Sequence, residues 1–229
     1  MLDGTVAEIA SPEGKGITYI MNLANITRLH NIISSVGLMR RMIALVEDYS
    51  HKRTVFRKVL KDQPLHILSL SQMKFLFEGN LILMLELGRL QGNSETIANY
   101  KHNEILRLIL PLAKLFTAKC AIEIGSEGME CFGGVGYMEN SGIPIILRDG
   151  YVLSIWEGTT NVLSLDFLRV IQNHSDIMTS FFNLIKKRIN KSREFLEGKD
   201  AVLQDILSKL SSNTQLINDI PTSRALSFL

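Results

Sequence analysis

The chain has 229 residues, 46% of them hydrophobic, and its 25 Lys and Arg residues nearly balance its 23 Asp and Glu residues. This length and composition allow one large or two small globular domains with a substantial core. The net charge of +2 gives no whole-molecule attraction to nucleic acid or membrane, so either partner would need a local patch. Two cysteines are too few for a disulfide framework or a structural zinc site, which favours no metal and a reducing compartment: cytoplasm, mitochondrial matrix or peroxisome.

The first residues differ from the rest of the chain. Residues 5–10 alternate weakly, as a strand does, before the Ser-Pro-Glu-Gly-Lys-Gly turn of residues 11–16. A single strand has no sheet to join. We therefore expect the chain to be cut from a longer protein, with a domain boundary at about residue 16.

After residue 16 the sequence predicts only helices and loops. Apolar residues recur at helical spacing, and Ser94 is predicted to end one helix and cap the next. Lys74, Glu78 and Glu86 interrupt the most apolar stretch, so no membrane span is expected. The predicted helices are 17–50, 65–90, 96–129, about 160–172, 175–196 and 201–211.

A glycine-rich loop, Gly133-Gly134-Val135-Gly136, follows the third long helix. Such a loop lets the backbone approach a ligand closely and suits a phosphate or pyrophosphate. Taken alone, such a loop is more often simply a helix C-cap and turn. Because no strand precedes it, the loop is not a Rossmann fingerprint.

A single carboxylate, Glu157, lies between Trp156 and Gly158 at a predicted helix start. Apolar and aromatic neighbours would suit a general base. Taken alone, a residue in such a turn more often merely complements the dipole of the helix.

Basic residues gather at two places, and one arginine stands apart. Arg53, near Phe56, could hold an anionic nucleotide or could complement the dipole of the first helix at its C-terminus. The run of residues 186–193 is typical of the solvated face of an amphipathic helix. Arg28, alone on a mostly apolar helix, either snorkels or pairs with a buried carboxylate.

The order of these motifs along the chain is stronger evidence of function than any one motif alone. Arg53-x-x-Phe56, Phe132-Gly133-Gly134-Val135-Gly136-Tyr137, Arg148-Asp149 and Trp156-Glu157-Gly158-Thr159-Thr160-Asn161 together resemble the acyl-CoA dehydrogenase superfamily over residues 1–172. Residues 154–158, residues 25–28 and the helices beyond residue 172 resemble its AidB-like, alkylation-response branch most. The resemblance implies a mainly α fold with three parts: the end of a middle β-domain (1–16), the C-terminal four-helix-bundle domain (17–172), and a truncated C-terminal helical extension (173–229).

The family resemblance also implies a function, FAD-dependent α,β-dehydrogenation of an acyl-CoA thioester in a homodimer or homotetramer. Glu157 then matches the base that removes the α-proton, and its backbone N–H matches a donor to the thioester oxygen. Arg28 and Gly158 match substrate-binding positions. The positions that match FAD contacts, the first four of them toward the FAD of a neighbouring subunit, are Arg53, Phe56, Gly133, Gly134, Thr159 and Asn161.

Three positions depart from or qualify the family pattern. Thr27 occupies the place where a few members carry the base, so Glu157 is the one candidate. Arg57 replaces the usual glycine after Arg-x-x-Phe, and Glu130 replaces the usual glutamine before the glycine loop. Two alternatives remain: an AidB-like flavoprotein associated with DNA in alkylation response, with nucleic acid not favoured, and a non-catalytic oligomerising helical module.

Overall fold

The computed structural model describes residues 3–97, 100–174 and 176–192, with scattered positions between 201 and 212. The described chain is mainly helical, as predicted. Within it, no helix is both long enough and apolar enough to cross a membrane. The longer helices are α1 (Gly16–Lys52), α2 (Pro64–Thr96), α3 (Tyr100–Phe132), α5 (Ile143–Ile155), α6 (Thr160–Asn173) and α7 (Ile177–Ser192), and the short α4 spans Gly134–Tyr137.

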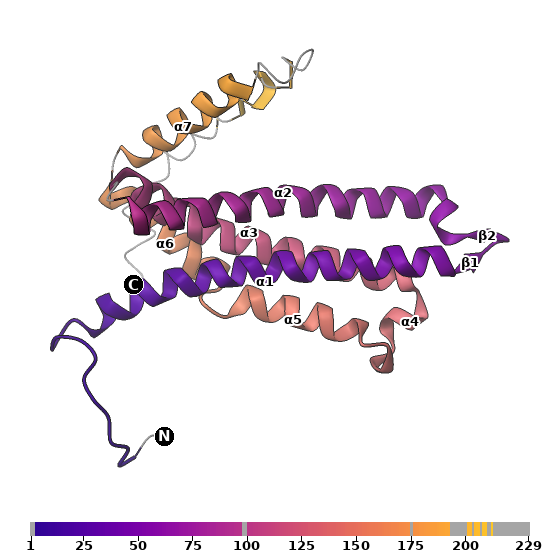
Figure 1. Cartoon of the computed structure of the whole chain (residues 1–229), viewed down its shortest axis with the longest axis horizontal. Helices are drawn as coiled ribbons and strands as arrows, with labels where there is room; N and C mark the ends of the chain where they lie inside the picture. Colours follow the sequence, from indigo (N-terminus) through magenta and orange to yellow (C-terminus); the bar gives the residue numbers. More distant parts are fainter. Residues whose placement is uncertain are drawn as a thin grey trace.

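The long helices α1, α2 and α3 lie side by side as the frame of a bundle (Figure 1). Helices α5 and α6 both pack against α3 and follow one another along the bundle, so together they take the fourth position. The predicted four-helix bundle is therefore confirmed, with its fourth member divided in two. The break between α5 and α6 is the turn that carries Glu157.

The core is formed by aliphatic and methionine side chains at helical spacing. One cluster joins α1, α2, α3 and α5, and a second lies between α1, α2 and α3 nearer the start of α1. Both form because α1 turns the same stripe inward along its length. The α1 members are Ile32, Met39, Met42, Ile43 and Val46, each no more than 2% exposed.

Helix α7 is attached to the bundle by a third apolar cluster. Leu108 of α3 and Val170 of α6 contact Ile177, Met178 and Phe182 of α7. An ion pair between Arg188 and Glu86 adds a polar contact to α2, with an N···O distance of 2.6 Å. The extension that begins after residue 172 thus shares a core with the bundle. Of the helix predicted at 201–211, the described positions, 201, 202, 204–206, 208 and 209, are helical as predicted, while the last residues of the helix predicted at 175–196 lie outside the described residues.

Two predictions at the ends of helices were wrong. Residues 5–10 form no strand, and Val6 and Ile9 are exposed. Helix α2 does not end before Ser94 but continues to Thr96. Its polar side chains bond back to the helix, Ser94 to the carbonyl of Gln91 at 2.7 Å and Thr96 to that of Gly92 at 2.8 Å. Side chains that satisfy the preceding turn extend a helix instead of capping a new one.

A small β-hairpin follows α1, where the sequence predicted only helix or loop. Its strands β1 (Thr54–Val55) and β2 (Lys58–Val59) are antiparallel, with Val55 opposite Lys58. The two residues at its tip, Phe56 and Arg57, have positive φ values of 49° and 66°. This is the backbone of a type I′ turn, which normally carries Asn-Gly or Asp-Gly. The hairpin was missed because it lacks that signal.

Candidate functional site

Arg53 and the glycine loop come together at the hairpin end of the bundle. They line one pocket of about 620 Å³, whose wall also includes Tyr49 and Glu130. Gly133 has a φ of 61°, and a Cβ there or at Gly134 would meet nothing within 4 Å, so both glycines present open backbone. A cationic side chain beside open backbone fits an anionic diphosphate, while Glu130 opposes it.

Phe56 does not share this pocket. It lies at the hairpin tip and is 94% exposed. The structure therefore brings together three of the four residues that the Arg-x-x-Phe and glycine motifs predicted as one group. The fourth is positioned to contact something outside this chain.

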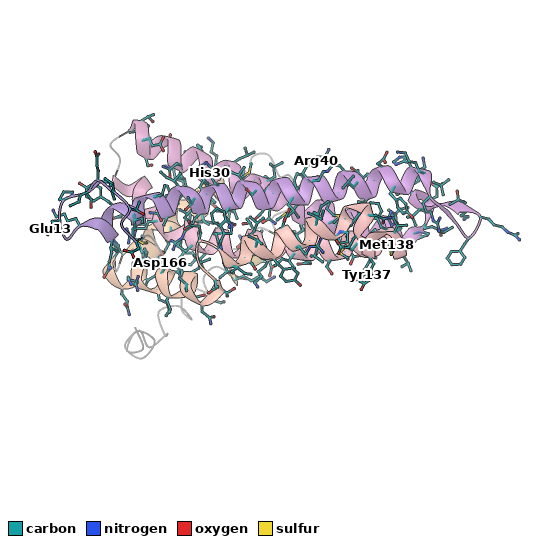
Figure 2. All side chains as sticks on the ribbon, turned by 90° about the horizontal axis from the view of Figure 1, so that it is seen from below. Glu13, His30, Arg40, Tyr137, Met138 and Asp166 are labelled. Atoms are coloured by element: carbon teal, nitrogen blue, oxygen red, sulfur yellow. The ribbon has the colours of Figure 1, made fainter. Side chains whose placement is uncertain are left out.

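The candidate base lies away from the hairpin end, partway along the bundle at the break between α5 and α6. Figure 2 shows Asp166, which belongs to this second group, far from Tyr137 and Met138 beside the glycine loop. Helix α5 ends at Ile155 and α6 begins at Thr160, so Glu157 sits in the connecting turn. Thr159 and Asn161 follow it and are exposed. The predicted site residues therefore form two separate groups.

The turn that carries Glu157 has an unusual backbone. Glu157 has a φ of 59°, in the left-handed region, and Gly158 has a φ of 110°. The left-handed conformation costs a residue with a Cβ about 1–2 kcal/mol. Only surrounding contacts can maintain it.

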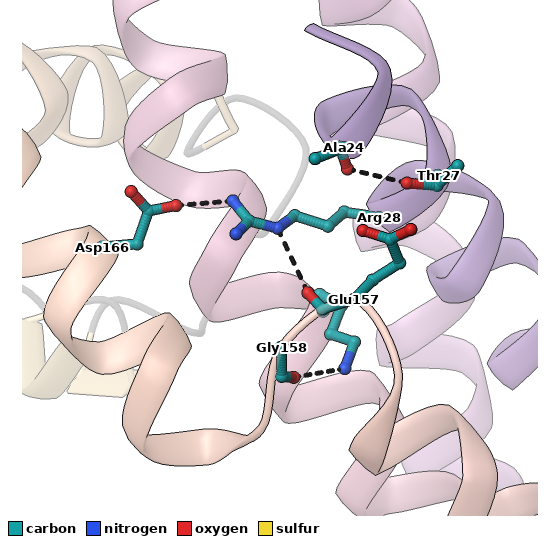
Figure 3. Close-up of polar contacts among 7 residues, drawn as sticks. Ala24, Thr27, Arg28, Glu157, Gly158 and Asp166 are labelled. Atoms are coloured by element: carbon teal, nitrogen blue, oxygen red, sulfur yellow. Dashed lines mark hydrogen bonds and ion pairs between the residues drawn. The ribbon is translucent and has the colours of Figure 1, made fainter. Parts of the chain in front are cut away.

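Arg28 is one of those contacts. Its guanidinium is buried, its Nη1 lies 2.5 Å from the Asp166 carboxylate, and its Nε donates to the carbonyl oxygen of Glu157 at 3.4 Å (Figure 3). Of the two readings left open for this lone arginine, the structure supports pairing with a buried carboxylate. The sequence had not identified Asp166 as the partner.

Lys114 on α3 is the second contact, and the sequence analysis missed it. Its side chain is 0% exposed, and its Nζ donates to the carbonyl oxygen of Gly158 at 2.7 Å. Burial lowers its pKa to about 8; the positive charge of Arg28 adds to that shift and the Glu157 carboxylate opposes it. The available signal was the same as for Arg28, a single charge in an apolar stretch of helix.

The Glu157 side chain extends toward the part of α1 that carries Thr27 and Arg28 (Figure 3). The Thr27 hydroxyl donates to the carbonyl of Ala24 at 3.0 Å, so its proton is engaged with the helix. Beside Glu157, Trp156 lines a largely apolar pocket of about 530 Å³ between α1 and α5. The turn thus presents one carboxylate next to an apolar hollow.

The second basic run lies on α7. Lys186, Lys187 and Lys191 are exposed, as predicted for a solvated face. Arg188 is instead held by Glu86, whose pKa its neighbours Arg89 and Arg188 lower to about 2. The part of α7 that the structure describes therefore uses one of its cations for internal packing.

The chain matches the family described as Acyl-CoA dehydrogenase, C-terminal domain, over residues 14–172. That match covers well over half of the sequence and agrees with the helical bundle. The chain belongs to the acyl-CoA dehydrogenase family, and the matched part is its C-terminal domain.

Individual relatives agree. Acyl-CoA dehydrogenase family member 11 of Caenorhabditis elegans is 42% identical over 224 residues, which are 93% of this chain and 36% of the relative. AidB of Escherichia coli (strain K12) is 35% identical over 177 residues, or 76% of this chain and 32% of the relative. The crystal structure of Caenorhabditis elegans ACDH-11 in complex with C11-CoA superposes with a TM-score of 0.87 at 40% identity, covering 93% of this chain and 36% of that one. The chain thus spans about a third of the length of these relatives.

Proposed function

We propose that this chain is the C-terminal part of an FAD-dependent acyl-CoA dehydrogenase in which Glu157 is the catalytic base. The observation that carries the proposal is the Glu157 turn: its one carboxylate extends toward α1 (Figure 3), and buried cations hold two successive backbone carbonyls. Family membership supports the reaction class. The C11-CoA in the structure of the relative supports an acyl-CoA substrate.

In the proposed reaction the Glu157 carboxylate removes the α-proton of the acyl thioester. FAD, when bound, accepts the β-hydrogen as hydride, and a Cα=Cβ double bond forms. The chain's own residues orient the acyl group and the base. Gly158 belongs to the turn that carries Glu157, and Arg28 holds that turn from α1, so we assign both residues to the substrate-binding part of the site. The backbone N–H of Glu157 is assigned as a donor to the thioester oxygen.

FAD contacts are proposed for both groups of site residues. Thr159 and Asn161 flank the base at the start of α6, while Arg53, Gly133 and Gly134 line the pocket at the hairpin end. Because the two groups are far apart, one chain would serve two flavins, and the exposed Phe56 would reach the second of them. This arrangement requires a homodimer or homotetramer.

Within the family we propose the branch that includes AidB and family member 11. Its support is the higher identity of these two relatives, 35% and 42%, against 25% for the very long-chain specific acyl-CoA dehydrogenase of Homo sapiens. The match to family member 11 also extends over 93% of the chain, beyond the end of the family match at residue 172. A DNA-associated role rests on the exposed lysines of α7 alone and is not favoured.

The test is Glu157→Gln in the assembled dehydrogenase, because it removes the base and leaves the shape of the side chain. We expect flavin content to stay normal while anaerobic bleaching of the flavin by a good acyl-CoA substrate slows by about a hundredfold or more. Glu139→Gln is the matched control, since Glu139 is an exposed carboxylate at the far end of the bundle. Near-normal bleaching in Glu157→Gln would contradict the assignment.

A further inference from the structure

The buried ammonium of Lys114 is energetically out of place. It is the largest side chain with less than 2% exposure, and it lies in the apolar middle of α3. None of the ion pairs among the described residues includes it. Burying a charge without a counterion is costly, and a methionine would fill nearly the same space without that cost.

The partner of Lys114 explains its position. Its Nζ reaches from α3 to the carbonyl of Gly158, while Arg28 reaches from α1 to the carbonyl of Glu157. Two cations on two different helices thus hold consecutive carbonyls of one turn. Asp166 of α6 fixes Arg28 in turn, so three helices converge on the turn (Figure 3).

This arrangement supplies what the strained turn needs. A left-handed Glu157 is disfavoured in isolation, and rotating its φ back would swing the attached side chain away from its present direction. A catalytic group must be held to within about 0.5 Å and 10–20°. A charge-assisted hydrogen bond from a helix core provides a more rigid anchor than contacts within a loop.

We propose that Lys114 is a positioning residue: its ammonium anchors the left-handed Glu157–Gly158 turn and thereby fixes the direction of the Glu157 carboxylate. The inference rests on the proposed role of Glu157 as the base. Lys114 acts through the backbone of the turn and does not itself contact the reacting atoms. Burial lowers the pKa of Lys114 to about 8, so near pH 7 the side chain is still mainly an ammonium.

The first test is made on the chain itself and does not depend on catalysis. Amide hydrogen exchange is followed at the two protected ends of the turn, Trp156, whose N–H donates to Val152, and Leu163, whose N–H donates to Thr159. It is compared between wild type, Lys114→Met and Lys119→Met, the last being an exposed lysine on the same helix. We expect Lys114→Met to speed exchange in the turn by about tenfold or more, with the amides of residues 39–46 in α1 unchanged. Lys119→Met should match wild type. Unchanged exchange in the turn of Lys114→Met would overturn the proposal whatever Glu157 does.

The second test is made in the assembled dehydrogenase. A misdirected base should lower kcat about ten- to a hundredfold in Lys114→Met while the KM for acyl-CoA and the flavin content stay close to wild type. A mobile turn with an unchanged kcat would overturn the positioning role. If Glu157→Gln is itself active, the proposed function fails and this inference with it, even where the exchange result holds.

Discussion

Three charged side chains, Arg28, Lys114 and Asp166, are buried around the Glu157 turn, with exposures of 5%, 0% and 9%. Arg28 and Asp166 neutralise one another through a short ion pair. Lys114 has the Gly158 carbonyl as its hydrogen-bond partner and the Glu157 carboxylate as a nearby charge. Its charge is therefore retained at a cost in folding free energy, and that cost depends on pH.

The first prediction concerns that dependence. Desolvation lowers the pKa of Lys114 to about 8 in the folded chain, against 10.5 for an ordinary lysine. Between these values the unfolded state binds the proton and the folded state does not, so the free energy of unfolding should rise with pH across this window. The rise should approach 1.4 kcal/mol per pH unit. It is measured as the difference in denaturant stability between wild type and Lys114→Met at pH 7.5 and 9.5.

Taking this difference also removes the effect of other groups. Burial raises the pKa of Cys131 to about 11, which lowers stability as pH rises above 9, but it does so in both proteins. Two parallel pH curves would contradict a depressed lysine pKa.

What the sequence can predict at this scale depends on the kind of signal. The motif of residues 156–161 predicts Glu157 as the candidate base. The burial of Arg28 was anticipated because a single arginine on an apolar helix has few other options. Asp166 and Lys114 were not found, because their roles depend on which helices face the 156–159 turn, and no local pattern encodes that contact.

At the scale of elements, the hairpin after α1 contains a strained backbone that lowers its stability. Its tip requires positive φ at Phe56 and Arg57, and Arg57 occupies a position where the family usually has glycine. The hairpin is held by its ladder and by the amide of Leu60, which donates to the carbonyl of Arg53 at 2.7 Å. Because Arg53 lines the pocket beside the glycine loop, the stability of the hairpin bears on that pocket.

The second prediction is that Arg57→Gly stabilises the hairpin. Glycine adopts a φ of 66° without steric cost, which offsets its greater freedom in the unfolded chain and leaves a net gain of about 0.5–1 kcal/mol. The Leu60 amide should then exchange about two to five times more slowly. Lys58→Gly is the control, because its position is an ordinary strand site where glycine weakens pairing. Equal effects of both substitutions would contradict the argument.

The helices show where the spacing of apolar residues is enough to predict the bounds of an element. Helix α1 was predicted at 17–50 and runs from Gly16 to Lys52, since an uninterrupted apolar stripe defines it. Helix α2 extends beyond its predicted end at residue 90. The side-chain amide of Gln91 donates to the Glu95 carboxylate at 2.7 Å, which stabilises this polar last part of the helix. Helix α5 was not predicted as a helix. Pro144 in its first turn is typical of a helix start, but Gly150 in its interior and several β-branched residues weaken the helical signal.

At the scale of the whole molecule, the two groups of site residues lie far apart along an elongated bundle. The proposed function therefore needs a second copy of the chain to complete each flavin site. The surface of α2 also indicates a second copy of the chain. Its apolar residues Leu68, Phe75 and Ile82 recur every seven residues and are 55%, 81% and 68% exposed. These three side chains lie on one face, opposite the buried Met73, Asn80 and Leu87.

The last prediction is that the chain self-associates through this face of α2, the Leu68–Phe75–Ile82 stripe. Covering about 400 Å² of apolar surface at about 25 cal/mol per Å² gives about 10 kcal/mol, comparable with the estimated cost of association. Light scattering at micromolar concentration should therefore report a dimer or larger. Phe75→Glu places a charge in the centre of the stripe and should shift the chain toward monomer, while Ile9→Glu, at an exposed position before α1, should not. If Phe75→Glu leaves the mass of the assembly unchanged, the interface lies elsewhere. If wild type is a monomer that binds no hydrophobic dye, the stripe is neither an interface nor an exposed apolar patch.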